Sequence, residues 1–241
     1  MKNLLKTRVL PILLLKNGVL VRSREFNFHQ VAGNPFDQVK RFNNWNVDEL
    51  INLNISRNEK IDFNNELEVI GFKLSKKNLE KKIPSNIFEF VKYLSKYCFM
   101  PLTFGGGLNN INQISQILFS GADKVVINTG AFINHNLISE TAIKFGSQCV
   151  IVSIDAKIVN GEYKVFIRGG KEETKVDVLD WALKAQSLGA GEILINSIDR
   201  DGTGEGYDIQ LCNKIVKNLS IPTIIAGGVG NIEDFYKGYK E

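Results

Sequence analysis

The chain has 241 residues, of which 44% are hydrophobic and 23% are charged, and its formal net charge is +4. This composition excludes a disordered or fibrous chain and fits a single globular domain over residues 1–241. The 30 basic and 26 acidic residues are too evenly balanced to indicate binding to nucleic acid. Three widely spaced cysteines and two histidines exclude a disulfide framework and a CxxC or His-rich metal site. We therefore expect no metal, no cofactor, and a reducing cytoplasm as the setting.

An apolar run, Val9–Leu15, lies near the start of the chain and superficially resembles a signal peptide. It is followed at once by Lys16-Asn17-Gly18 and has no small-residue cleavage site. It is also far shorter than the roughly 20 apolar residues that span a bilayer. We therefore expect a strand buried on both faces and no association with a membrane.

Along the rest of the chain, continuous apolar runs alternate with longer segments of helical periodicity. This alternation is typical of parallel strands, which are covered on both faces and joined by crossover helices. The runs predict strands at Val9–Leu15, Leu50–Ile55, Pro101–Phe104, Lys124–Ile127, Cys149–Ile154, Glu192–Asn196 and Pro222–Ala226. The clearest helical segments are Pro35–Trp45, Ile111–Phe119, Leu137–Phe145 and Val178–Leu188. Seven such units in one domain favour a (β/α) barrel over an open doubly wound sheet.

An internal repeat divides the predicted barrel into two halves, about 1–145 and 146–241. Asp48–Arg57 is echoed by Gly191–Arg200, Leu13–Lys16 by Ile154–Lys157, and Gly106-Gly107 by Gly227-Gly228. The first half carries a charged insertion, 58–82, and a fourth unit, Gly121–Thr129, that has no counterpart in the second half. We therefore expect a (β/α)8 TIM barrel of two half-barrel repeats that lacks its eighth βα unit.

Glycine-rich and polar turns follow four of the predicted strands, at the end where a barrel binds its ligands. Glycine lets backbone amides approach a phosphate closely, and a helix that begins there favours an anion. One such turn alone is equally typical of a tight strand-to-helix connection. Matching turns in both halves are more specific and predict two facing phosphate sites, suited to a bisphosphate, at Gly106, Gly107, Asn128, Thr129, Asp201, Gly202, Gly227 and Gly228.

Asp155 follows the buried run Val150–Ile154, at the same end of the predicted barrel. A carboxylate in this position is a candidate general acid or base, although a lone aspartate more often caps a loop or a helix. The repeat places Leu14 at the corresponding position of the first half. A reaction that needs one carboxylate from each half would therefore have only one in this chain.

Charged residues begin predicted strands at the opposite end of the barrel. They are Arg8, Glu49, Lys124 and Glu192. Each of them alone would be an ordinary solvated charge at the rim. Because their signs alternate around one axis, together they predict a ring of salt bridges that serves as a plug or a gate below the barrel core.

Several collinear segments give the chain a resemblance to a known family. They are Gly121–Val125, Phe145–Gln148, Ile154–Lys157, Gly189–Leu194, Ser197–Thr203 and Gly206–Asp208. With these motifs the whole chain resembles the cyclase subunit of imidazole glycerol phosphate synthase, a (β/α)8 barrel of histidine biosynthesis. In that family a glutaminase subunit docks under the barrel and releases ammonia. The ammonia passes a charged gate and reaches a nucleotide-derived bisphosphate at the top.

The resemblance implies roles for the residues singled out above. It matches the gate to the four charged residues at the strand starts, the phosphate loops to the glycine-rich turns, and the glutaminase-facing surface to Asp123. It matches one of two catalytic aspartates to Asp155. The other is Leu14 here, which cannot transfer a proton. Asn54 is a further departure, because an aspartate is usual at that position.

The segment Leu13–Lys16 is instead similar to a paralogous branch of the family. Those paralogues accompany a glutaminase and an N-acetyl-sugar amidotransferase in making acetamidino sugars of surface polysaccharides. The leading hypothesis from the sequence is therefore an amidotransferase subunit that receives ammonia and relays it onward. Two alternatives stay open: an authentic cyclase, forming imidazole glycerol phosphate and AICAR with Asp155 alone, and a non-catalytic scaffold that binds a phosphorylated small molecule.

Overall fold

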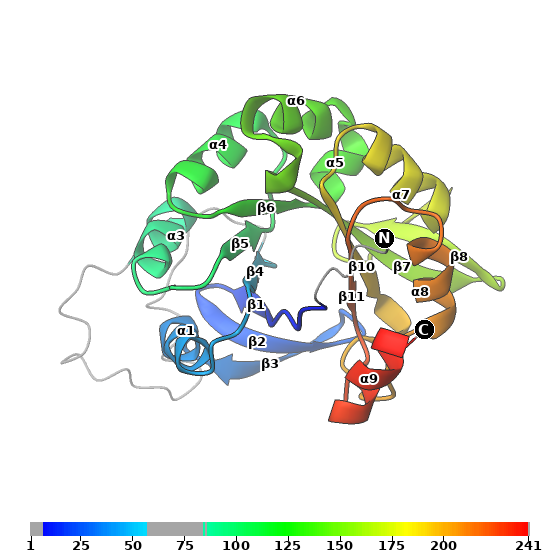
Figure 1. The fold of residues 1–241 in the computed structure, drawn as a ribbon, viewed down its shortest axis with the longest axis horizontal. Helices are drawn as coiled ribbons and strands as arrows, with labels where there is room; N and C mark the ends of the chain where they lie inside the picture. Colours follow the sequence, from blue (N-terminus) through cyan, green and yellow to red (C-terminus); the bar gives the residue numbers. More distant parts are fainter. Residues whose placement is uncertain (1–6, 57–83, 85, 241) are drawn as a thin grey trace, which may run out of the picture.

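Seven parallel strands curl around a common axis, and helices cover the outside of the curled sheet (Figure 1). The computed structural model describes residues 7–56, 84 and 86–240, so the predicted insertion, 58–82, lies outside the described residues. The strands lie side by side in the order β11 (Thr223–Ala226), β10 (Glu192–Ser197), β7 (Val150–Val159), β6 (Lys124–Ile127), β5 (Leu102–Gly105), β4 (Leu50–Asn54) and β1 (Ile12–Lys16). The fold is the predicted (β/α) barrel of two half-barrel repeats. Within the described residues, no strand joins β11 to β1.

The helices follow the strands as crossover connections on the outer face. They are α1 (Pro35–Asn44), α3 (Ile87–Ser95), α4 (Ile111–Phe119), α5 (Thr129–Ile133), α6 (Asn136–Phe145), α7 (Val178–Ser187), α8 (Ile209–Val216) and α9 (Ile232–Lys240). Many begin where an Asn or Asp side chain accepts a hydrogen bond from a backbone amide of the first turn, which satisfies an otherwise unpaired donor. Such caps are Asn34, Asn86, Asn110, Asp177 and Asp208. No helix in the described ranges is both long and apolar enough to cross a bilayer.

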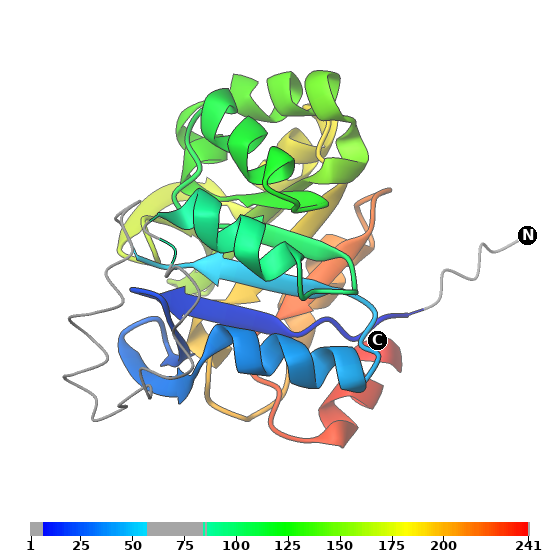
Figure 2. The same cartoon turned by 90° about the vertical axis from the view of Figure 1, so that its left-hand side faces the viewer.

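Each half of the barrel also carries a hairpin at the carboxyl end of its first strand. In the first half β1 turns into β2 (Val19–Arg24) and β3 (Phe28–Gly33), and in the second β7 turns into β8 (Glu162–Ile167) and β9 (Glu172–Asp177). Asn17-Gly18 and Asn160-Gly161 form the turns, and all four residues have positive φ, as a type I′ turn requires. Figure 2 shows β1 and β4 side by side, with their arrowheads pointing to this end.

The pleat of the strands separates two apolar clusters. Ile51, Val126, Ile151 and Leu194 form an inner cluster, whereas the neighbouring residues Ile193 and Ile195 belong to the large cluster beneath the helices. Because successive side chains of a strand point to opposite faces, this division fixes which residues line the interior. On β10 they are the even-numbered residues from Glu192 to Asn196, and on β7 the odd-numbered residues from Ile151 to Asp155.

The outer cluster predicts a large cost for truncating one of its aromatic side chains. Phe104 is fully buried, so Phe104→Ala should lower the free energy of unfolding by about 3–5 kcal/mol through lost burial and a residual cavity. Phe99 is 85% exposed, and the matched change Phe99→Ala should alter it by less than about 0.5 kcal/mol. Urea denaturation of both variants measures the difference. Equal losses in the two variants would contradict the burial pattern.

Candidate functional site

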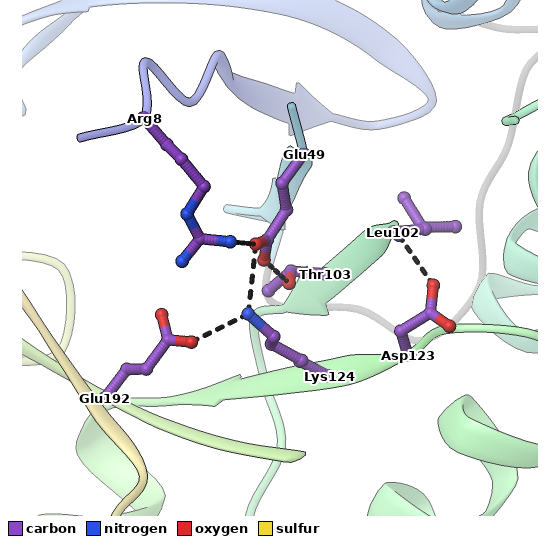
Figure 3. A network of polar contacts seen from close by, with 7 residues as sticks. All are labelled: Arg8, Glu49, Leu102, Thr103, Asp123, Lys124 and Glu192. Carbon is purple, nitrogen blue, oxygen red and sulfur yellow. Dashed lines mark hydrogen bonds and ion pairs between the residues drawn. The ribbon is translucent and has the colours of Figure 1, made fainter. Parts of the chain in front are cut away.

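Four charged side chains meet at the amino ends of the parallel strands (Figure 3). Lys124 begins β6 and Glu192 begins β10, while Glu49 immediately precedes β4 and Arg8 lies ahead of β1. Lys124 Nζ lies 3.0 Å from Glu49 Oε2 and 2.7 Å from Glu192 Oε1. Arg8 Nη1 lies 3.1 Å from Glu49 Oε2. The four side chains form one linked series of three ion pairs, with Glu49 and Lys124 at its centre.

The centre of this network is shielded from solvent, while its outer member is not. The Glu49 side chain is 1% exposed and that of Lys124 17%, whereas that of Arg8 is 39% exposed. Burial works to lower the pKa of Lys124, but the hydrogen bonds to Glu192 and Glu49 outweigh it and raise the pKa. Lys124 therefore stays protonated and links the buried Glu192 carboxylate to that of Glu49, which is also paired with Arg8.

Two more side chains support this end of the barrel (Figure 3). Thr103 Oγ1 donates a hydrogen bond of 2.7 Å to Glu49 Oε1, and the register places Thr103 beside Lys124. Asp123 Oδ2 accepts a hydrogen bond of 2.8 Å from the Leu102 amide, which ties the loop before β6 to the start of β5. Thr103 was not predicted as a site residue from the sequence. The available signal was a polar side chain within the predicted buried strand Pro101–Phe104, which needs a hydrogen-bond partner.

Asp155 lies on the interior face of β7, near the carboxyl ends of the strands. Its side chain is buried, and Oδ2 accepts a hydrogen bond of 2.9 Å from Asn128 Nδ2. Burial raises the pKa of Asp155 to about 7, the Asn128 hydrogen bond acts in the opposite direction, and the nearby Asp201 charge adds to the rise. A carboxyl group with this pKa exchanges its proton near neutral pH, which suits a general acid or base.

Leu14 contributes to an apolar wall on the first-half side of the interior. It shares a face with Ile12, which packs against the inner cluster, and its neighbour in register on β4 is Leu53. Asp155 belongs to a polar wall on β6, β7 and β10, together with residues such as Asn128. No proton-transferring group faces inward from the Leu14 position. The described residues also contain no cluster of three or more His, Cys, Asp or Glu side chains arranged to hold a metal ion.

The predicted phosphate turn of the first half contains two glycines with different surroundings. A Cβ on Gly106 would lie 1.9 Å from the Asn54 carbonyl oxygen, so packing against β4 already requires glycine there. A Cβ on Gly107 would meet no described atom within 4 Å, so the backbone of Gly107 is the one open to a ligand. In the next predicted phosphate turn, after β6, Thr129 Oγ1 accepts a hydrogen bond of 2.9 Å from the Arg168 amide, which joins that turn to the β8–β9 hairpin.

The corresponding turns of the second half are engaged by other backbone segments. The Asp201 carboxylate accepts a hydrogen bond of 3.2 Å from the Phe26 amide, at the tip of the β2–β3 hairpin. A Cβ on Gly202 would come within 2.2 Å of a carbonyl oxygen of β2, and one on Gly228 within 2.1 Å of the Gly206 carbonyl oxygen. Close backbone packing therefore accounts for these two glycines.

Asn196 is a further interior residue that the sequence analysis did not single out. It is the direct neighbour of Asp155 in the register of β10 and β7 and lies on the same face as Leu194. Its Oδ1 atom is buried and accepts no hydrogen bond from the described residues, and a Cβ on Gly227 would lie 3.1 Å from it. Counting in steps of two from Glu192 would have identified it as an inward-facing polar side chain.

Comparisons with known proteins place the chain in a family. The family model described as "Histidine biosynthesis protein" matches residues 80–241. The imidazole glycerol phosphate synthase subunit HisF of Campylobacter concisus is 40% identical over 233 residues, which cover 97% of this chain and 84% of that protein. The protein of the same name from Chloroherpeton thalassium is 39% identical over 236 residues, which cover 98% of this chain and 85% of that protein.

The raised pKa of Asp155 makes the stability of the fold depend on pH. Its carboxyl group holds a proton up to about pH 7 in the folded chain, whereas the ordinary value is 3.8. The contribution of the protonated Asp155 carboxyl group to the stability of the fold is complete below about pH 4 and is lost as the pH rises toward 7. The free energy of unfolding of the natural chain, relative to Asp155→Asn, should therefore fall by up to a few kcal/mol over this interval.

Urea denaturation from pH 4 to pH 8 measures that difference. The matched control is Asp37→Asn, because the Asp37 side chain is 67% exposed and the change should leave the pH profile of the natural chain nearly intact. A constant difference between the natural chain and Asp155→Asn across the whole interval would show that the Asp155 carboxyl group is not protonated near neutral pH.

Proposed function

Because the chain belongs to the histidine biosynthesis protein family, we propose that it is a cyclase-type subunit of a glutamine-dependent amidotransferase and conducts ammonia along its barrel axis. The observation that carries the proposal is the order of side chains along that axis. A buried ion-pair network lies at the amino ends of the strands, an apolar cluster follows, and a polar wall with Asp155 lies at the carboxyl ends.

The apolar cluster supports the passage of neutral ammonia. Ile51, Val126, Ile151 and Leu194 offer no hydrogen-bonding side chain, so a charged ammonium ion would lose its hydration without compensation there. Neutral ammonia pays a much smaller cost. Lys124 stays protonated and repels ammonium, and its side chain needs only to leave one of its two glutamates to open a path. The network therefore acts as a gate that favours the uncharged form.

Exposed aromatic side chains around the gate support a protein partner at this end. Trp45 is 65% exposed, Phe99 85% and Phe119 81%. Phe119 is the last residue of α4, and the other two lie in connections that lead from a helix to the next strand. Such connections lie at the amino ends of parallel strands, around the same end as Lys124 and the nearby Asp123. Clustered exposed aromatics are typical of protein interfaces. We assign this face to a glutaminase partner that forms a heterodimer with the chain and releases ammonia below the gate.

The finer assignment is to the ammonia-relay branch that takes part in making acetamidino sugars of surface polysaccharides. Its support is the apolar wall at Leu14, where the first half of the barrel supplies no carboxyl group to pair with Asp155. The ammonia then passes to an N-acetyl-sugar amidotransferase, and Gly107 marks the place for a phosphorylated ligand. Three free cysteines agree with a reducing, cytoplasmic setting.

Reconstitution with the glutaminase and the sugar amidotransferase tests the relay. Acetamidino-sugar formation from glutamine should require this chain. Lys124→Met and the isosteric Glu192→Gln should both lower the sugar product formed per glutamine hydrolysed several-fold, because each breaks the bridge that closes the gate. Excess ammonium chloride in place of glutamine should restore product formation.

Lys40→Met is the matched control, because the Lys40 side chain is 65% exposed and lies on α1 away from the network. Its product-to-glutamine ratio should equal that of the natural chain. Product formation without the chain would refute the relay. An unchanged ratio in both gate variants, with folding verified by circular dichroism, would refute the role of the gate.

A second candidate function, the authentic cyclase, is favoured by one observation. Asp155 is buried, held by Asn128 and has a pKa raised by burial to about 7, which is the state that a single acid–base group needs at neutral pH. Loss of one of two paired acid–base groups typically lowers the rate by about 10²–10⁴-fold, so cyclisation with Asp155 alone would be slow.

Complementation of a cyclase-deficient histidine auxotroph distinguishes the two functions. The relay predicts that the natural chain does not restore growth, because Leu14 cannot supply the second proton transfer. Growth that is restored by the natural chain and lost in Asp155→Asn would instead establish the cyclase. The variant is expressed and its solubility is checked in the same strain, so that absence of protein is not mistaken for absence of activity.

A further inference from the structure

Two side chains with acceptor oxygens lie side by side inside the carboxyl end of the barrel. Asp155 of β7 and Asn196 of β10 are direct neighbours in the parallel register and share the interior face. Asn196 Oδ1 is buried and receives no hydrogen bond from the described residues. Leaving a buried acceptor in this state is unfavourable, because the atom has lost its hydration without a replacement hydrogen bond. The geometry therefore calls for a ligand that donates hydrogen bonds.

We propose that Asn196 and Asp155 together bind ammonia, or the ammonium ion formed from it, at the end of the barrel path. The inference rests on the proposed function and adds the place where the nitrogen is held. One N–H of the ligand donates to Asn196 Oδ1 and another to the Asp155 carboxylate. Asn128 keeps the carboxylate oriented through its hydrogen bond of 2.9 Å to Oδ2, whether or not the ligand is bound.

The surroundings of the pair favour a nitrogen ligand over other small ligands. An anion is disfavoured because the two residues present acceptor oxygens. A divalent cation requires more oxygen ligands than this wall offers, because Leu14 and Leu53 line the first-half side of the interior. Water would satisfy Asn196, but it brings no charge to complement the carboxylate. Ammonium supplies both the N–H donors and the positive charge.

Titration of the isolated full chain by carboxyl carbon NMR tests the proposal without a partner or an acceptor. The Asp155 signal is identified by its loss in Asp155→Asn. In ammonium chloride the Asp155 midpoint should shift to lower pH than in equimolar potassium chloride, because bound ammonium stabilises the carboxylate and potassium donates no hydrogen bonds. The shift should disappear in Asn196→Leu.

Asn52→Leu is the matched control. Asn52 is also a buried strand asparagine whose side-chain atoms receive no hydrogen bond from the described residues, but its place in β4 puts it on the outer face with Leu50. This variant should keep the ammonium-specific shift. Equal Asp155 midpoints in the two salts would overturn the proposal and are the result expected for a site that holds only water. A shift that survives in Asn196→Leu would also overturn it.

The outcome is independent of the test of the proposed function. Absence of an ammonium-specific shift would leave the gate and the relay standing, because neither requires ammonia to pause at Asn196. Conversely, sugar formation that proceeds without this chain would refute the relay while the shift in Asp155 titration stayed measurable.

Discussion

The bridge from Lys124 to Glu49 and Glu192 is the interaction on which the rest of the site depends. It joins the amino ends of β4, β6 and β10, which lie far apart in sequence, across the interior of the curled sheet. A buried ion pair adds little net stability, because the cost of desolvation offsets most of the attraction. The apolar clusters on both faces of the sheet hold the fold together, and the bridge determines where charge lies within it.

Successive side chains of a strand point to opposite faces, so every second residue faces the interior. Along one strand these inward residues change from charged at the amino end to apolar and then to polar at the carboxyl end. On β10 the inward residues are Glu192, Leu194 and Asn196, so a single strand carries a charge of the ion-pair network, an apolar side chain and a polar acceptor in sequence. The same spacing on β7 brings Asp155 to the depth of Asn196. In the proposed conduction, a small uncharged nitrogen base would meet its polar partners only after it has left its hydration shell behind.

Some elements of the fold can be located from the sequence because they have a clear pattern of apolar residues, and others cannot. The seven parallel strands are apolar runs covered on both faces, so their positions follow from the sequence to within a few residues. The positions of hairpin strands such as Glu172–Asp177 do not, because this strand is mostly polar and none of its residues is fully buried, so it forms no apolar run. The Asn-Gly turns are the sequence signal for the hairpins. The turn glycines are ambiguous for another reason. The sequence does not distinguish the roles of Gly106 and Gly107. The structure does, because only Gly106 packs so closely against the Asn54 backbone that a side chain would not fit.

Both halves of the barrel carry a hairpin after their first strand, but only the second half has a carboxyl group there, because Leu14 stands where the repeat places Asp155. This difference limits the proton transfers that the site can make. A second carboxylate facing Asp155 would repel it and separate the two pKa values, which gives one acid and one base. With Leu14 at the corresponding position of the first half, the pKa of Asp155 is raised to about 7 chiefly by its own burial, and the nearby Asp201 charge adds to the rise. Such a group gives or takes one proton from a passing nitrogen. One such group cannot by itself make the paired proton transfers of a ring closure, and this is the physical basis for proposing conduction rather than cyclisation.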